Sequence, residues 1–330
     1  MQKRQNQFNS IVNGVNQHEV GKTMKKRGQH HVWEYYLKSW SSKGKIYCLG
    51  DGKIFKTNPK NVAKKRDFYR LKELSENDIE LIKKLAIEKC PQHLQKIHLE
   101  WINQFNFIFN FKKELDSLGL PQEIDAEIDK FINNFQEDIH SQIEDRSIKF
   151  IDSILRRDIE FFKTDIGNIN FTYFLCQQYL RTQNIKSRVL SNTQRSKYDI
   201  EKIWNVLSHI FATNMAATLS NTRQNLRMVL IINESSIPFI TGDQPVVNTY
   251  AVDKFGNELV DDFELYYPVS SKLAILITQK AEYLDIDRLF VEDKDVELFN
   301  SYIIKSSHEQ IYSNSKEILE RYKKEPHFSL

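Results

Sequence analysis

Residues 227–250, RMVLIINESSIPFITGDQPVVNTY, are the stretch where the pattern of the chain changes from helix to strand. β-Branched residues fill its two apolar segments, and turn-forming residues separate them, which is typical of strands. A third segment of this kind, KLAILITQ, follows at residues 272–279. The C-terminal third, from about residue 226 to 312, is therefore predicted to be rich in β-sheet.

The chain before this stretch has a helical pattern over about residues 75–222, with apolar residues three or four positions apart. Ser75 stands before a first turn that contains acids, as an N-cap residue does, and Pro91 ends the first helix. The pattern over residues 121–162 is too long for one ordinary helix, so we expect a break or kink near residues 141–147. Residues 170–183 and 198–221 predict two further helices with apolar faces.

An N-terminal hairpin is predicted from KIYCLGDGKIFKTN at residues 45–58, because two alternating segments flank Gly50-Asp51-Gly52. We expect the hairpin to join the C-terminal sheet. A short strand at residues 310–312 and a final helix at 315–324 are predicted to follow. The predicted fold is α+β, with an N-terminal hairpin, a mostly helical middle and a sheet-rich C-terminal third that closes on the hairpin. Residues 1–26 are expected to be a poorly ordered basic arm, and residues 27–330 a single domain.

The charge of the chain is nearly balanced, with 47 basic and 44 acidic residues and a net charge of +3. Bulk charge therefore does not indicate nucleic-acid binding. Basic residues cluster at 3–27 and again in KNVAKKRDFYRLK at 60–72. Such clusters are more often solvated surface than a nucleic-acid footprint, and we favour the former interpretation here.

Compartment and cofactors are constrained by what the sequence lacks. Cys48, Cys90 and Cys176 are widely spaced, without the spacing of metal ligands or of a disulfide framework. The chain has no apolar signal segment and no run of about 18 apolar residues. We expect a cytoplasmic protein with no membrane association, no cofactor and no metal.

The first candidate site residues are His30 and His31 in HHVWEYYLKSW, residues 30–40. Imidazole titrates near neutrality, so either could act as a general base or acid. The alternative is a histidine at a helix entry that hydrogen bonds to the backbone, because the segment predicts a short helix with Val32, Tyr35, Tyr36 and Trp40 near one face.

Gln178 and Arg181 lie three residues apart in CQQYLRTQ, residues 176–183, and are expected on one face of an apolar helix. A cation in that setting needs a carboxylate, a phosphate or a group of carbonyls, since an unpaired buried charge is costly. A structural ion pair and a contact with a substrate anion are both compatible with this pattern.

Two further candidates lie in the C-terminal third. Asp243 follows an apolar segment in a Thr-Gly-Asp-Gln-Pro turn, a position suited to a catalytic carboxylate or to a residue that caps the backbone. Asn300 interrupts an apolar helical face and could hold a loop or a ligand. The acids Glu144, Asp145, Asp152, Asp158 and Glu160 alternate with arginines, which favours a solvated helix face over a metal site.

Several motifs, taken in order, resemble a bacterial family, the domain-of-unknown-function family numbered 4238, over about residues 28–314. They are QHHVWEYYLKSW (29–40), PKNVAKKRDFY (59–69), QQYLRTQ (177–183), FITGDQPV (239–246), YYPVSSKLAI (266–275), LFNSYI (298–303) and QIYSN (310–314). Trp33, Gly242 and Ser271 depart from the family pattern, which commonly has Pro, Ser and Pro there. The resemblance implies the family's fold and no particular activity.

Two functions follow as hypotheses. The first is a hydrolase or transferase acting on RNA, DNA or a nucleotide without a metal, such as a nuclease-like defence effector. It would use His30, His31, Arg181 and Asp243 in catalysis, with Gln178 and Asn300 binding substrate. The second is a non-catalytic module that recognises a protein or nucleic-acid partner, in which the same residues tie the fold together. The sequence does not predict an oligomeric state.

Overall fold

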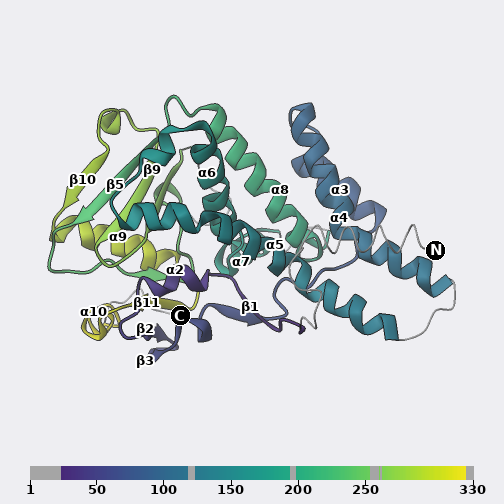
Figure 1. Ribbon diagram of the computed structural model, residues 1–330, viewed down its shortest axis with the longest axis horizontal. Helices are drawn as coiled ribbons and strands as arrows, with labels where there is room; N and C mark the ends of the chain where they lie inside the picture. The colour runs from purple at the N-terminus through teal and green to yellow at the C-terminus, as the bar shows by residue number, and fades with distance from the viewer. Residues whose placement is uncertain (1–23, 118–122, 194–197, 253–259, 261, 325–330) are drawn as a thin grey trace.

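The computed structural model describes residues 24–117, 123–193, 198–252, 260 and 262–324, and has the predicted α+β fold (Figure 1). The helices are α2 (Glu34–Lys38), α3 (Glu76–Ala86), α4 (Gln92–Ser117), α5 (Glu123–Leu155), α6 (Asp165–Leu180), α7 (Gln183–Asn192), α8 (Ile200–Asn221), α9 (Asp293–Ser306) and α10 (Lys316–Tyr322). The strands are β1 (Gly28–His30), β2 (Ile46–Gly50), β3 (Lys53–Thr57), β4 (Lys64–Arg66), β5 (Arg227–Asn233), β6 (Thr241–Gly242), β7 (Val247–Asn248), β8 (Glu264–Pro268), β9 (Leu273–Thr278), β10 (Arg288–Val291) and β11 (Gln310–Ser313). Short 3-10 turns lie at Pro59–Asn61, Glu160–Lys163, Thr249–Ala251 and Ala281–Tyr283.

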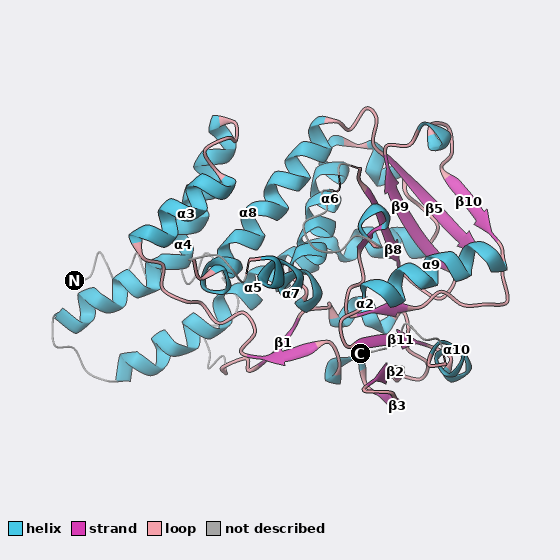
Figure 2. Cartoon of the chain, turned by 180° about the vertical axis from the view of Figure 1, so that it is seen from behind, coloured by secondary structure: helices cyan, strands magenta, loops and turns pink. Residues whose placement is uncertain are grey.

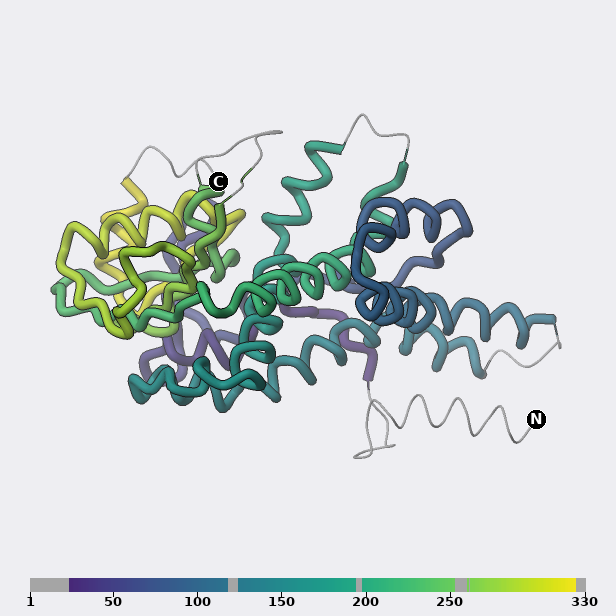
Figure 3. The backbone as a smooth tube through the Cα atoms, turned by 90° about the horizontal axis from the view of Figure 1, so that it is seen from above, coloured from purple at the N-terminus to yellow at the C-terminus, as the bar shows by residue number. Residues whose placement is uncertain are grey.

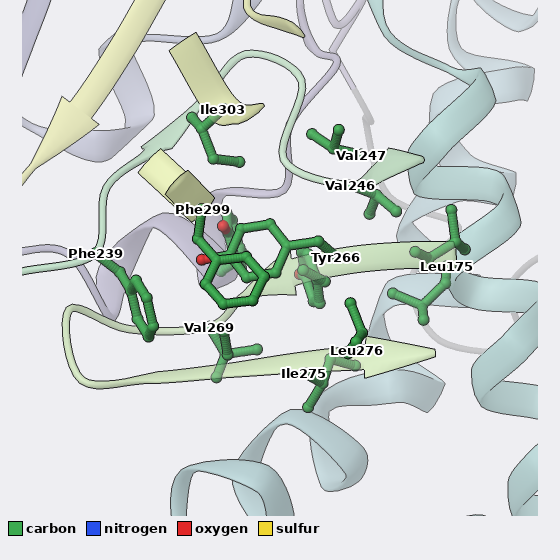
Figure 4. Packing of buried hydrophobic residues seen from close by; sticks show 14 of the residues in the cluster. Leu175, Phe239, Val246, Val247, Tyr266, Val269, Ile275, Leu276, Phe299 and Ile303 are labelled. Carbon is green, nitrogen blue, oxygen red and sulfur yellow. The ribbon is translucent and has the colours of Figure 1, made fainter. Parts of the chain in front are cut away.

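The sheet-rich C-terminal third contains a five-stranded sheet in the order β10-β5-β9-β8-β7. This sheet lies at one end of the molecule, with α3 and α4 at the other (Figure 2). Helices cover both of its faces. Because side chains alternate along a strand, consecutive residues of one strand contact different helices. Tyr266 of β8 stacks on Phe299 of α9, with ring centroids 4.6 Å apart (Figure 4). The next residue, Tyr267, contacts Phe174 of α6 instead. Burial on both sides explains the continuous apolar run of β9.

The N-terminal hairpin joins a sheet in the order β3-β2-β11-β6, which is separate from the five-stranded sheet (Figure 1). The expectation that the C-terminal third closes on the hairpin is confirmed, because β11 and β6 come from that third, but its strands form two sheets and not one. Asp51 and Gly52 both have positive φ angles, 49° and 64°, as a tight two-residue hairpin turn requires. β11 pairs with β2 on one side and with β6 on the other. The strand and final helix expected near the C-terminus are thus present as β11 and α10.

The predicted break near residues 141–147 is wrong, because α5 is one continuous helix of 33 residues. The hydroxyls of Ser141 and Ser147 donate to the carbonyl oxygens of Glu137 and Ile143, so both serines are accommodated inside the helix. α5 also contributes to both hydrophobic clusters of the core, which supports its length through tertiary packing.

The segment predicted as a helix over residues 30–40 is mostly not helical. Residues 28–30 form β1, which pairs antiparallel with β4, and α2 covers only five residues. β4 lies within the second basic cluster of the sequence, residues 60–72. The aromatic residues still pack into the core, with Tyr36 and Trp40 fully buried.

The core consists of two hydrophobic clusters. One joins the two sheets to α2, α6, α9 and the end of α5, and the other lies among α3, α4, α5 and α8. The far ends of α4 and α5 project beyond the rest of the described chain (Figure 3). Most of the predicted basic arm, residues 1–23, lies outside the described residues. The single-domain organisation stays a prediction.

Candidate functional site

Arg181 lies at the centre of the predicted site, immediately after α6, and its side chain is only 3% exposed. Its Nη2 lies 2.7 Å from Glu144 Oε1 and donates to the carbonyl oxygen of His30 at 2.9 Å. Its Nε donates to the carbonyl oxygen of His31 at 3.3 Å. The chain itself therefore supplies a carboxylate and two carbonyls to this buried arginine, whereas its Nη1 has no hydrogen-bond partner among the described residues.

Glu144 is buried on α5, so the expectation of a solvated side chain is wrong for this member of the acidic cluster. Burial raises the pKa of Glu144 to about 7, the charge of Glu137 adds to this effect, and Arg181 opposes it. Burial also lowers the pKa of Arg181, but the two carboxylates outweigh burial and leave that pKa raised. The arginine stays charged and holds its partner by charge and hydrogen bonding.

His30 and His31 lie at the end of β1 and just beyond it, and their backbones are the groups that contact Arg181. The imidazole Nε2 of the half-buried His30 lies 3.1 Å from the carbonyl oxygen of Lys60. The His31 ring is buried with its centroid 5.7 Å from that of Phe68, and burial lowers its pKa to about 3. A lowered pKa makes His31 a poor general acid near neutral pH.

Gln178 is buried beside Glu144, so it faces the same polar core as Arg181. Its place on α6 agrees with the expectation that Gln178 and Arg181 share one side of the helix. Four predicted residues, His30, His31, Gln178 and Arg181, are thus brought together.

Asp243 directly follows β6 and binds the backbone that leads into β11. Its carboxylate accepts hydrogen bonds from the N–H groups of His308 (2.7 Å), Glu309 (2.7 Å) and Gln310 (3.0 Å). Burial raises the pKa of Asp243 to about 6, although these three donors favour the charged form. The neighbouring Gln244 contacts Thr182, the residue after Arg181, through a short side-chain hydrogen bond. The residue next to Asp243 thus contacts the residue next to Arg181, and the Asp243 carboxylate itself binds backbone N–H groups.

Asn300 holds a different loop. Its Oδ1 accepts from the N–H of Ile240, and its Nδ2 donates to the carbonyl oxygen of Pro238 and to the hydroxyl of Tyr322. Both N–H groups of the Asn300 amide thus donate hydrogen bonds, and the residue is fully buried. Of the two alternatives, holding a loop or a ligand, the structure shows the loop.

A buried polar column that was not predicted from the sequence lies beside Arg181. His140 of α5 stacks on His209 of α8, with centroids 5.0 Å apart, and His209 stacks on Trp101 of α4. Gln177 Nε2 lies 3.2 Å from His209 Nδ1. The spacing of Gln136, His140 and Glu144, four residues apart on one face of α5, is the signal that could have revealed this column.

A second feature is a groove of about 440 Å³ between the segment after β4 and the helices α7 and α8. Its basic residues are Lys65, Arg66, Arg70, Lys72 and Lys186, its acidic residues are Asp67 and Glu201, and Phe68, Leu71, Gln183, Leu190 and Asn205 complete the lining. We call these twelve residues the basic groove. Four of the five cations come from the cluster at residues 60–72, which the sequence analysis interpreted as solvated surface.

The electrostatics of the basic groove favour an anion. Lys186 lies over the Phe68 ring, 5.3 Å from its centroid, and burial lowers its pKa, as do Lys72 and Lys65. Gln183 opens α7, so the positive end of that helix dipole also borders the groove. Glu201, at 3.4 Å from Lys186 Nζ, neutralises part of this charge.

The groove keeps uncompensated charge among the described residues. Arg70 contacts Asp129 at 2.7 Å, and Arg66 lies 3.6 Å from Asp67. Lys65 hydrogen bonds to the uncharged Gln183, and Lys72 has no ion-pair partner in the described part of the chain. An anionic ligand would supply the missing negative charge.

The fold and these motifs define an α+β protein in which buried polar residues surround one buried arginine. The chain belongs to the family described as protein of unknown function (DUF4238), whose model matches residues 28–317. No curated protein and no solved structure matches it. Within the described residues, no helix is long and apolar enough to cross a membrane, and no group of three or more His, Cys, Asp or Glu side chains is placed to hold a metal ion.

Proposed function

We propose that the protein is a binding module for the phosphate backbone of a nucleic acid, and that the basic groove is its binding surface. The gathering of Lys65, Arg66, Arg70 and Lys72 with Lys186 in one groove carries this proposal. Cations that track a phosphate chain provide most of the affinity of a protein that binds nucleic acid without reading its sequence.

Phe68 adds a second type of contact to the groove. Its ring is half-buried beneath Lys186 and lies among the cations, where a base could approach an aromatic side chain. Stacking on aromatic rings is the usual partner of phosphate binding in proteins that bind single strands. A single-stranded ligand is therefore the form that this surface suits best.

The hydrolase predicted from the sequence stays a prediction. Three of the residues assigned to catalysis in that hypothesis, His31, Arg181 and Asp243, are buried. Arg181 and Asp243 already form short hydrogen bonds with the backbone of the protein itself. Binding without turnover needs no rearrangement of these residues, and this favours the binding module over the enzyme.

The test is the affinity of fluorescein-labelled single-stranded RNA and DNA, measured by fluorescence anisotropy at fixed salt, with a free nucleotide as competitor. The variant Lys65→Gln/Arg66→Gln/Lys72→Gln removes three exposed cations. We expect its Kd to rise about tenfold or more, since three contacts of roughly 0.5 kcal/mol each amount to one order of magnitude.

A matched control is Lys45→Gln/Lys53→Gln/Lys294→Gln, which removes the same charge from exposed positions near or on β2, β3 and α9. Its Kd should stay within about twofold of the wild-type value, because only distant charge is lost. Equal weakening in both triple variants, or no binding by the wild-type protein, would overturn the proposal.

A further inference from the structure

A larger groove lies on the helical side of the molecule, away from β4 and α7. It has a volume of about 740 Å³ and runs between α4 and α5, with Tyr173 of α6 at its border. Its lining residues are Glu100, Trp101, Asn103, Gln104, Phe107, Phe131, Phe135, Ile139, Gln142, Ile143, Arg146 and Tyr173. We call it the helical groove. It shares no lining residue with the basic groove.

Ordered aromatic rings line the helical groove. Phe131 stacks on Phe135 with centroids 5.1 Å apart, and Trp101 stacks on the buried ring of His209 at 5.2 Å. Phe131 and Trp101 are only partly buried, so part of each ring faces the groove. Because these rings are already held by their neighbours, a flat apolar ligand could cover them at a small cost in side-chain entropy.

The charge on the lining consists of one cation and one carboxylate. Arg146 is exposed and has no ion-pair or hydrogen-bond partner within the described ranges. Tyr173 also lines the groove, where burial raises the pKa of its hydroxyl and the charge of Arg146 partly opposes that rise. Glu100 contributes the carboxylate, and the remaining polar side chains are the neutral amides of Asn103, Gln104 and Gln142.

We propose that the helical groove binds a small amphipathic anion, with a planar apolar body against Trp101 and Phe131 and its negative group at Arg146. The volume lies in the range of small-molecule sites, and an apolar lining with a single directing charge is the usual composition of such sites. The unpaired Arg146 selects an anion over a neutral ligand of the same shape. This site is independent of the binding of nucleic acid in the basic groove.

The experiment compares two naphthalene dyes by fluorescence titration of the full chain. 1-Anilinonaphthalene-8-sulfonate has a planar apolar body and one negative charge, and N-phenyl-1-naphthylamine has the same body without charge. Arg146→Gln should raise the Kd of the sulfonate about fivefold and leave that of the neutral dye within about twofold. Glu100→Gln should lower the Kd of the sulfonate about twofold, because a competing carboxylate is removed. Arg156→Gln removes an exposed arginine that does not line the groove, and should change neither Kd.

The location is tested by Asn103→Trp, which places a large side chain at an exposed position on the lining. This variant should abolish binding of both dyes, while its circular dichroism and melting temperature stay those of the wild-type protein. The proposal is overturned if neither dye binds, if Arg146→Gln leaves the sulfonate Kd unchanged, or if folded Asn103→Trp still binds both dyes. Retention of oligonucleotide affinity in Arg146→Gln separates this result from the proposed function.

Discussion

Arg181 shows why a residue that looks catalytic in a sequence can be structural. A cation among apolar neighbours must be paired, and the sequence cannot say whether the partner is a ligand or the chain. Here the partners are Glu144 and the backbone of His30 and His31, which lie far from Arg181 in sequence. The arginine thereby joins β1, α5 and α6, and its removal should affect folding before it affects binding.

Arg181→Met is expected to lower the free energy of unfolding by about 3–5 kcal/mol, because it leaves the buried carboxylate of Glu144 without its partner. Urea denaturation followed by circular dichroism measures this change. The double variant Arg181→Met/Glu144→Met should lose much less than the sum of the two single variants, since neither charge then remains buried alone. Wild-type stability in Arg181→Met, combined with lost binding of nucleic acid, would instead identify a ligand-contacting residue.

His209 makes stability depend on pH. Burial, aided by Arg181, lowers its pKa from an ordinary 6.5 to about 3, so the unfolded chain binds its proton first as the pH falls. The contribution of His209 to the free energy of unfolding is therefore present above pH 6.5. It is lost progressively as the pH falls toward about 3, the pKa of His209 in the folded protein. At pH 5 the loss from this residue is about 2 kcal/mol.

In His209→Asn, where the amide oxygen can still accept from Gln177, the fall in unfolding free energy between pH 7.5 and pH 5 should be smaller by about 2 kcal/mol. Urea denaturation at the two pH values gives the comparison, and the other titrating groups are common to both proteins. An unchanged pH dependence would show that the His209 imidazole takes up its proton equally in the folded and unfolded states.

Elements whose signals are local could be predicted from the sequence, and those that depend on distant partners could not. Ser75 and Asp78 form a reciprocal capping box at the start of α3, and Asp51-Gly52 fits the hairpin turn by its own backbone preference. β1, by contrast, exists because β4 pairs with it, and no local pattern marks either three-residue strand. The continuity of α5 is likewise a consequence of packing in both hydrophobic clusters.

The contact between β6 and the end of α9 is tight enough to test. A Cβ added to Gly242 would overlap the hydroxyl of Ser307. Gly242→Ala is expected to cost about 1–2 kcal/mol of unfolding free energy through overpacking. In a Ser307→Ala background the same change should cost less, and this difference is measured by denaturation of the four proteins of the cycle. Equal costs in the two backgrounds would contradict a direct clash.

At the scale of the whole molecule, the polar residues divide into a buried set and two surface grooves. The buried set joins β1 to α5 and α6 through Arg181. This structural role is one of the two hypotheses that the sequence supports for these residues. The basic groove combines residues 65–72 with residues 183–205, and the helical groove combines α4, α5 and α6. Neither assembly could be predicted from the sequence, because each depends on how segments far apart in the chain pack together.

The measurement that tests the central claim most directly is the salt dependence of single-stranded RNA affinity in the wild-type protein and in Lys65→Gln/Arg66→Gln/Lys72→Gln. Each cation that neutralises a phosphate contributes about 0.7 to the slope of log K against log salt for a single strand. If the basic groove binds the phosphate backbone, the triple variant should show a slope smaller in magnitude by about 2, with an unchanged melting temperature. An identical slope in the two proteins would contradict the account.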